Sequence, residues 1–405
     1  MRIILMFAVA VFGSVASVSP GASNDITILV SIDGFRADYL DRGITPVLSR
    51  LAADGVRSAV EPSFPSVTFP NHFTLITGLY PDHHGIVDNH FEDKTLGRVW
   101  DINDFKGRDE PLWWKGGTPL WVIAEAQGVH SASMFWPCTG FDAQGRPPAL
   151  ALGFTPDLTM EQQPSQVLAW LDLPAAERPR FIMLYFYYID HSGHEAGPDG
   201  RATEATIREA DAALGKLVDG LKQRNLFERT NLVIVADHGM AEISRDRVIE
   251  LDELLNLDHV RVITEGSLSG LESKPGFGRG VEKALFSRHD HMSCWRKERM
   301  PSRFRYGSNA RIPPILCLAD IGWQIATKAT KAKWPGDNRG NHGFDPADPS
   351  MAGVFVAYGR AFRSRVTWPK FPNVDVYPLL AKVMGVKPLP NDGRLATVKA
   401  MLASR

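Results

Sequence analysis

Short apolar runs recur along the chain, and each predicts a strand buried on both faces of a sheet. These runs occupy residues 25–32, 181–189, 231–236 and 353–358. Between them lie segments whose apolar residues have helical spacing, at 45–54, 202–224 and 374–383. Strands that alternate with helices favour an α/β fold, with a mostly parallel central sheet and helices on both faces.

The segment 241–340 breaks this alternation. It is less regular and richer in charge, including the basic run 288–305. We expect it to form a smaller inserted cap region, with 25–240 and 341–390 as the catalytic α/β core. Asp290 and Glu298 interrupt the basic run, which predicts a solvated face rather than a nucleic-acid site.

The chain of 405 residues carries a net charge of -1, so nothing draws it as a whole to a nucleic-acid polymer or an acidic membrane. Residues 1–22 contain one basic residue, an apolar run and small residues suited to cleavage, which indicates a signal peptide. The apolar run falls short of the roughly 20 residues that a membrane span requires. We therefore expect a soluble, exported protein, periplasmic or secreted, without stable membrane insertion.

Three cysteines are too few for a disulfide scaffold. Export permits a disulfide, and we expect Cys294 to pair with Cys317. The alternative is three buried thiols, including Cys138.

The stretch 62–84 places a threonine directly before an apolar run that predicts a helix. Thr68 precedes Phe69 and Pro70, and proline suits the first turn of a helix because its missing N–H would be unpaired there. A hydroxyl at this end lies beside free backbone N–H groups that favour an anion such as phosphate. To act as a nucleophile it needs a base or a metal. The alternative is that Thr68 only caps the helix.

Three acids, Asp33, Asp190 and Asp237, directly follow apolar runs. Active sites of α/β proteins gather at the carboxyl ends of the strands, so we expect these acids to share one edge of the sheet. The segments around them also contain candidate imidazole ligands, at His194, His238 and His342.

Carboxylates and imidazoles are the ligands that zinc accepts where cysteine is not used. The three acids and three histidines together make six candidate ligands, which divide into two three-ligand sites. Two metal ions about 4 Å apart clamp the attacking and leaving oxygens of a phosphoryl displacement. His191 is left outside the ligand set, as an orienting residue or an exposed loop residue.

These motifs together resemble the nucleotide pyrophosphatase/phosphodiesterase family of the alkaline phosphatase superfamily. They run through nearly all of the chain after the leader, in the family's order: SIDGFR at 31–36, PSVTFPNHFTLITGLYPDHHGI at 65–86, Asn89 in DNHF, DHSGH at 190–194, ADHGM at 236–240 and GNHGF at 340–344. The resemblance implies a hydrolase with two zinc ions per chain and an alkaline phosphatase-like fold.

The resemblance also implies roles for single residues. One zinc would be held beside Thr68, and the other would stabilise the leaving oxygen. The first set of implied ligands is Asp33, Asp237 and His238. The second set is Asp190, His194 and His342. Thr68 would form a threonyl-phosphate that water then hydrolyses. Asn89 and the Phe69 N–H would donate to a phosphate oxygen.

Phe69 and Tyr185 are the candidates for holding the substrate's base between two rings, or else they are core aromatics. Stacking tolerates every base, so we expect little base selectivity. The substrates would be small nucleotide diesters or pyrophosphates that yield nucleoside 5′-monophosphates.

Thr68 has no arginine near it in sequence, and a monoester dianion favours an arginine fork, so a diester is favoured. The nearest rival is a choline- or glycerophospho-diesterase acting on lysophospholipid head groups, which would use an aromatic cage for the quaternary ammonium. The candidates for such a cage are Trp113, Trp114, Trp121 and Trp136. An alkaline phosphatase-like monoesterase is a second rival. The intact ligand set argues against a non-enzymatic binding protein.

Overall fold

The computed structural model describes residues 25–138, 146–155, 157–334, 336 and 338–404. The signal peptide expected at 1–22 lies outside this range. Within the described part of the chain, no helix combines the length and the apolar character needed to cross a bilayer.

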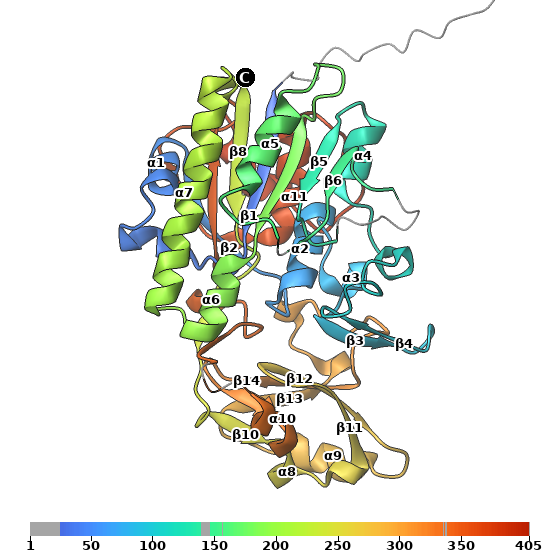
Figure 1. Cartoon of the computed structure of the whole chain (residues 1–405). Helices are drawn as coiled ribbons and strands as arrows, with labels where there is room; N and C mark the ends of the chain where they lie inside the picture. Colours follow the sequence, from blue (N-terminus) through green and yellow to red (C-terminus); the bar gives the residue numbers. More distant parts are fainter. Residues whose placement is uncertain (1–24, 139–145, 156, 335, 337, 405) are drawn as a thin grey trace, which may run out of the picture.

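A central sheet of nine strands forms the middle layer of the larger part of the molecule (Figure 1). Along its path the strands follow the order β18-β2-β17-β8-β1-β7-β5-β6, and β19 pairs with β2. The bounds are β1 Ile26–Ile32, β2 Val56–Glu61, β5 Ser131–Met134, β6 Leu150–Leu152, β7 Phe181–Phe186, β8 Thr230–Val235, β17 Gly353–Tyr358, β18 Val366–Thr367 and β19 Phe371–Pro372.

The pairing of these strands confirms the mostly parallel sheet. β1 lies between β7 and β8 and runs parallel to both, while β17 pairs antiparallel with β8 and β2. All seven residues of β1 are buried, as are all six of β7 and of β8, because helices cover both faces. β2 lies near the edge, and its alternating buried and half-buried residues reflect one covered face.

Helices pack on both faces of the sheet, as expected. On one side α7 lies against α1, α5 and α6, and on the other α2 lies against α4 and α11 (Figure 1). The bounds are α1 Pro46–Asp54, α2 Thr68–Thr77, α3 Pro81–His84, α4 Leu120–Ala126, α5 Gln163–Leu171, α6 Tyr188–Ala196, α7 Arg201–Gln223, α11 Val376–Met384 and α12 Leu395–Val398. The buried face of α7 repeats at three- and four-residue spacing, through Ile207, Ala210, Leu214, Leu217 and Leu221.

A smaller lobe of mixed helix and strand lies beyond the carboxyl edge of the central sheet, next to the hairpin of β3 and β4 (Figure 1). Its main sheet is antiparallel, in the order β11-β12-β14-β13, and β10 pairs with β15. The bounds are β3 His90–Asp93, β4 Arg98–Asp101, β9 Ala241–Glu242, β10 Val248–Glu250, α8 Leu251–Leu254, β11 Val260–Thr264, β12 Leu268–Ser273, α9 Gly278–Leu285, β13 Met292–Arg296, β14 Ile315–Ala319, β15 Gln324–Ala326, α10 Lys328–Lys333 and β16 Gly340–Asn341.

This lobe has a hydrophobic cluster of its own, built around residues such as Leu251, Leu271 and Ile325. Other residues of the lobe, including Phe304 and Leu316, join the cluster of the main sheet. The exact division at 241 and 340 stays a prediction.

The expected disulfide is confirmed. Cys294 on β13 and Cys317 on β14 face each other in the strand register and are bonded, while Cys138 is a buried free thiol. The bond therefore ties together two strands of the smaller lobe.

Replacing Cys294 and Cys317 together by alanine should lower the free energy of unfolding by about 3 kcal/mol, because the bond closes a loop in the unfolded chain. The two cysteines are 23 residues apart in sequence. Denaturant unfolding of the parent and the double variant measures this, and reduction of the parent should reproduce the loss. Equal unfolding midpoints for parent and double variant would contradict the prediction.

Candidate active site

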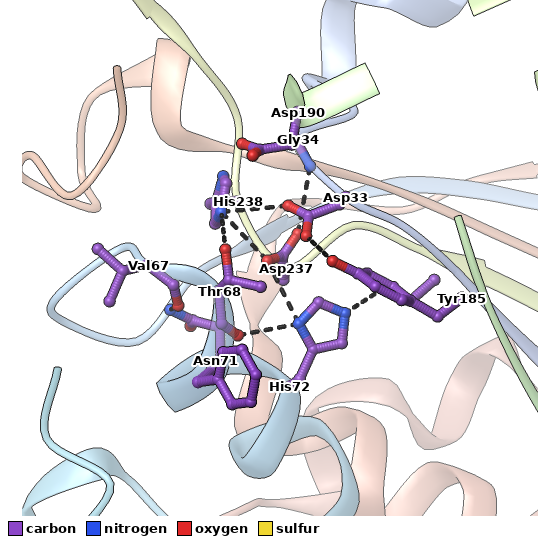
Figure 2. Close-up of polar contacts among 12 residues, drawn as sticks. Asp33, Gly34, Val67, Thr68, Asn71, His72, Tyr185, Asp190, Asp237 and His238 are labelled. Atoms are coloured by element: carbon purple, nitrogen blue, oxygen red, sulfur yellow. Dashed lines mark hydrogen bonds and ion pairs between the residues drawn. The ribbon is translucent and has the colours of Figure 1, made fainter. Parts of the chain in front are cut away.

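Two acids lie side by side at the carboxyl edge of the central sheet. Asp33 follows β1 and Asp237 lies two residues beyond β8, and both are buried because these neighbouring parallel strands end together (Figure 2). The N–H of Gly34 donates to Oδ1 of Asp237 at 3.3 Å. The parallel topology thus brings together acids that are 204 residues apart in sequence.

Asp190 lies within a helix, whereas we expected it to follow a strand directly. The apolar run that predicted a strand as far as residue 189 ends as β7 at Phe186, and α6 begins at Tyr188. Asp190 and His194 are therefore four residues apart on one helix, where such side chains are neighbours. Nε2 of His194 lies 3.4 Å from Oδ2 of Asp190.

His342 completes this second group. Its Nε2 lies 3.5 Å from Oδ1 of Asp190, and potential ligand atoms of Asp190, His194 and His342 all lie within 4.8 Å of one another. This is the three-ligand set that the resemblance implied for one zinc.

His238 lies at the other group. Its Nε2 is 3.1 Å from Oδ2 of Asp237 and 3.4 Å from Oδ1 of Asp33. The same nitrogen is 3.3 Å from Oγ1 of Thr68 (Figure 2). The structure thus assembles all six candidate ligands beside the candidate nucleophile.

The three imidazoles are held in the form that binds a metal. Each donates its Nδ1–H to a backbone carbonyl: His194 to Gly340 at 2.8 Å, His238 to Gly239 at 2.8 Å and His342 to Ser66 at 2.9 Å. Nε2 of each ring therefore faces the carboxylates, where it can bind a metal once it carries no proton. Such outer hydrogen bonds fix the tautomer and the ring orientation of metal-binding histidines.

The carboxylates have oxygens that only a cation would satisfy. Among the described residues, Oδ1 of Asp33, Oδ1 of Asp190 and Oδ2 of Asp237 are buried without a hydrogen-bond partner. Burial, followed by the charge of Asp237, raises the pKa of Asp33 well above its usual value, and burial with the charge of Asp190 does the same for Asp237. Uncompensated buried charges are costly. The donor set therefore fits metal ions.

The second group already contains an ion pair. Burial opposes the charge on His194, but the Asp190 carboxylate outweighs it and raises the pKa of His194 to about 9. Burial lowers the pKa of His342 to about 4. A metal ion at this site would replace the proton on His194.

His72 is a residue of the site that the sequence analysis missed. Its Nδ1–H donates to the carbonyl of Thr68 at 2.9 Å and lies 3.4 Å from Oδ2 of Asp237, while its Nε2 accepts from Ser31 at 2.8 Å. Burial lowers the pKa of His72 to about 3, so the ring is neutral. Although His72 lies close enough to Asp33 and Asp237 to complete a metal-binding group, both of its nitrogens are engaged. We therefore assign it to holding Asp237 and the start of α2.

Thr68 is the first residue of α2, and Val67 occupies the cap position. The Thr68 side chain makes no capping hydrogen bond and contacts His238 instead, so the simple capping role is not observed. The N–H of the next residue, Phe69, donates to Oδ1 of Asn89 at 3.0 Å. Asn89 and the Phe69 N–H thus lie together at the start of α2, as the resemblance implied.

Phe69 and Tyr185, the two residues expected to hold the substrate's base, have different surroundings. Phe69 is 5% exposed, with its ring edge-on to Trp100 and one face toward Arg108. Tyr185 is 7% exposed, its ring is edge-on to His72, and its hydroxyl donates to Oδ2 of Asp33 (Figure 2). Base stacking therefore stays a prediction for Phe69. It stays a prediction for Tyr185 as well, whose hydroxyl in addition holds Asp33.

Other residues considered in the sequence lie away from the ligand groups. His191 is an exposed residue of α6 whose Nε2 is 3.5 Å from Glu195, so it is not a ligand. The tryptophans proposed for a choline cage, Trp113, Trp114, Trp121 and Trp136, are all fully buried in the core. That cage is therefore contradicted.

Six carboxylate and imidazole ligands around a buried hydroxyl, at the carboxyl edge of a parallel sheet, are typical of metal-dependent enzymes that hydrolyse phosphate esters. The family model described as type I phosphodiesterase / nucleotide pyrophosphatase matches residues 27–345. The chain belongs to this family and is a hydrolytic phosphodiesterase.

Known relatives resemble the chain over most of its length. It is 35% identical to an uncharacterised pyrophosphatase/phosphodiesterase of Schizosaccharomyces pombe, covering 90% of this chain and 78% of the relative. It is 33% identical to a bis(5′-adenosyl)-triphosphatase of Xenopus laevis, covering 93% and 82%. Murine ectonucleotide pyrophosphatase/phosphodiesterase 5, solved as an inactive threonine-to-alanine variant in complex with AMP, has a TM-score of 0.88 and 31% identity, over 94% of this chain and 100% of that one.

Tyr185→Phe should weaken metal binding about 10- to 100-fold, because it removes the hydroxyl that orients Asp33. A chelator competition titration on the purified protein measures this. Tyr358→Phe is the matched control, since Tyr358 ends β17 and its ring stacks on Phe227 instead. Equal metal affinity in Tyr185→Phe and the parent would refute the role we assign to Tyr185.

Proposed function

We propose that the chain is an exported two-zinc nucleotide pyrophosphatase/phosphodiesterase. It cleaves small nucleotide diesters or pyrophosphates through a threonyl-phosphate and releases nucleoside 5′-monophosphates. The observation that carries this proposal is the placement of Thr68 Oγ1 at 3.3 Å from His238, within a set of carboxylates whose buried oxygens have no partner.

The ligands divide into two sets. Asp33, Asp237 and His238 would hold the metal beside Thr68. Asp190, His194 and His342 would hold the second. Bound zinc would supply Lewis acidity that lowers the pKa of a hydroxyl and neutralises charge on a leaving oxygen. Carboxylate and imidazole ligands without cysteine suit this metal.

Thr68 forms a bond from Oγ1 to phosphorus, and the bond to the leaving oxygen breaks. Water then attacks the threonyl-phosphate, releases the nucleoside monophosphate and restores the hydroxyl. His72 holds the carbonyl of Thr68, so the hydroxyl keeps its orientation through both steps. Asn89 and the Phe69 N–H lie where they can donate to a non-bridging oxygen as negative charge develops there.

The surroundings of Thr68 support a diester rather than a monoester. Arg108 reaches this region from a different part of the sequence and packs on the ring of Phe69. The Thr68 hydroxyl contacts the ring of His238. A substrate with a single negative charge therefore suits the site better.

Aromatic side chains near Phe69 offer room for a base. The Arg108 guanidinium also lies over the ring of Phe105, which is 59% exposed. Phe154 is 36% exposed, and its ring is stacked on Phe105 at a centroid distance of 6.3 Å. These exposed rings are better placed than Tyr185 to contact a base. A lipid head group is less favoured, because the tryptophans of the expected cage are buried.

Small nucleotides are the expected partners, and export remains part of the proposal. It is supported by the leader-like residues 1–22 and by the ectonucleotide name of the structural relative. Periplasmic and secreted destinations both fit.

Thr68→Ala should lower kcat for a nitrophenyl ester of thymidine 5′-monophosphate by more than about 1,000-fold, because no other side chain supplies the nucleophile. Thr68→Ser keeps a hydroxyl and should retain far more activity. Phosphate trapped on Thr68 after an acid quench, read by mass spectrometry, gives an independent readout. Turnover of Thr68→Ala within a few fold of the parent would exclude the covalent route.

The substrate class is tested by kcat/KM for three nitrophenyl substrates side by side: the thymidine 5′-monophosphate ester, the phosphate monoester and phosphocholine. We expect the nucleotide diester to be preferred by about 100-fold or more, roughly 2.7 kcal/mol of transition-state discrimination. Preference for phosphocholine would keep the metal site but change the substrate class. Preference for the monoester would contradict the expectation that a substrate with a single negative charge suits the site better.

A further inference from the structure

The backbone of His342, a candidate metal ligand, is held by a side chain of the smaller lobe. The hydroxyl of Ser267, the residue just before β12, donates to the carbonyl of His342 at 2.6 Å, across 75 positions in sequence. Both residues are 6% exposed, so little water competes for this hydrogen bond. The lobe therefore reaches the site through Ser267.

A glycine next to His342 permits this close approach. Gly343 has a φ of +90°, a conformation that favours glycine, and a Cβ there would lie 2.4 Å from Oγ of Ser267. On the core side of the same turn, the hydroxyl of Ser66 donates to the carbonyl of Phe344 at 2.9 Å. The turn that carries His342 is thus clamped between the core and the lobe.

A second path from the lobe to His342 runs through two side-chain amides. Nδ2 of Asn341 donates to Oε1 of Gln324 at 2.6 Å, and the N–H of His342 donates to Oδ1 of Asn341 at 2.9 Å. Gln324 lies on β15 and is 2% exposed. The carbonyl of His342 and its N–H are therefore both held by groups that connect to the lobe.

The lobe also keeps Ser267 itself in place. The carbonyl of Ser267 accepts from the N–H of Ala319, the last residue of β14, at 2.8 Å. The residue before it, Gly266, exchanges two backbone hydrogen bonds of 2.8 Å with Ile325 on β15. Ser267 and Gln324 thus belong to one hydrogen-bonded frame, and side chains on such a frame hold a ligand precisely.

Potential ligand atoms of Asp190, His194 and His342 lie within 4.8 Å of one another and would hold the second metal ion. We propose that Ser267 and Gln324 are positioning residues through which the smaller lobe sets the affinity of this second site. A shift of the His342 backbone moves its ring relative to the other two ligands, and outer hydrogen bonds that orient ligands change metal affinity about 10- to 100-fold. The inference deepens the proposed two-metal function and rests on it.

The first metal site has its outer hydrogen bonds in the core instead. Asp33 accepts from the Tyr185 hydroxyl, and Asp237 accepts from the N–H of Gly34. The ring of His238 donates to the carbonyl of the residue that follows it. Loss of a hydrogen bond from the lobe should therefore weaken one of the two sites and spare the other.

Ser267→Ala tests this in a chelator competition titration of the metal-free protein with zinc, which gives a dissociation constant for each site. We expect one constant to rise about 10-fold or more and the other to stay within about 2-fold of the parent's. Co²⁺ in place of zinc gives an independent readout, because its absorption spectrum follows the ligand geometry. One of the two equivalents should change its spectrum.

Ser269→Ala is the matched control. Ser269 lies on β12, is fully buried, and donates to the carbonyl of Thr264 within the lobe at 2.8 Å. Each variant removes one hydroxyl that donates to a backbone carbonyl, so a general loosening of the lobe would weaken metal binding in both. Ser269→Ala should keep both of the parent's constants.

Unchanged constants in Ser267→Ala, a rise in both of them, or an equal rise in Ser269→Ala would overturn the inference. If Ser267→Ala does not fold, Gln324→Met decides by the same titration, because it removes the acceptor of Asn341 and keeps an unbranched chain. A rise confined to one constant then supports the proposal, and any other result overturns it. Failure of the proposed function looks different, because the parent itself would then bind fewer than two zinc ions.

Discussion

Mutual repulsion of three carboxylates in one buried site is the constraint on which the rest of the site depends. Asp33, Asp190 and Asp237 converge at the carboxyl edge of the sheet, and each keeps one buried oxygen without a partner. Such a cluster is stable only when positive charge compensates it. The neighbouring groups suit this purpose: three imidazoles turn their Nε2 atoms inward, and Tyr185 and Gly34 donate to carboxylate oxygens that would otherwise add to the repulsion.

The smaller lobe takes part in this arrangement, because His342 follows it in the chain. The chain enters and leaves the lobe through β9 and β16, which pair with each other and which we call the neck. Gly340 and Asn341 therefore lie against the segment just after His238. Gly340 also accepts the Nδ1–H of His194, and the ring of His342 donates to Ser66, two residues before Thr68. The neck therefore connects both ligand groups with the start of α2. The pairing of β9 with β16 therefore returns the chain to the same place on both sides of the lobe, which keeps the geometry of the site.

Much of the site could be predicted because its acids directly follow apolar strands, and parallel strands bring such positions to one edge. The helix at Asp190 could not be predicted, since Tyr187, Tyr188 and Ile189 continue the apolar run of β7 and conceal where the strand ends.

Other residues of the site could not be recognised from their neighbours in sequence. His72 lies inside a wholly buried helix, so the residues around it indicate a core position rather than a site. The hydrogen bonds from Tyr185 to Asp33 and from Ser31 to His72 link positions 152 and 41 residues apart, which no local pattern encodes. Arg108 was missed for the same reason, because closeness in sequence was the only available measure of its distance from Thr68.

The charges of the proposed site also bear on the substrate. Two divalent cations would bring four positive charges, and the three carboxylates with an ionised Thr68 would bring four negative ones, so the reacting site would be close to neutral before the substrate arrives. A diester adds one negative charge, while a monoester dianion adds two and needs a further cation against its extra oxygens. Arg108 is the cation near Phe69, but it lies among aromatic rings and is not paired with Thr68. Its position suits recognition of the group attached to the phosphate rather than of the phosphate itself. The same balance therefore explains why the site would favour a diester.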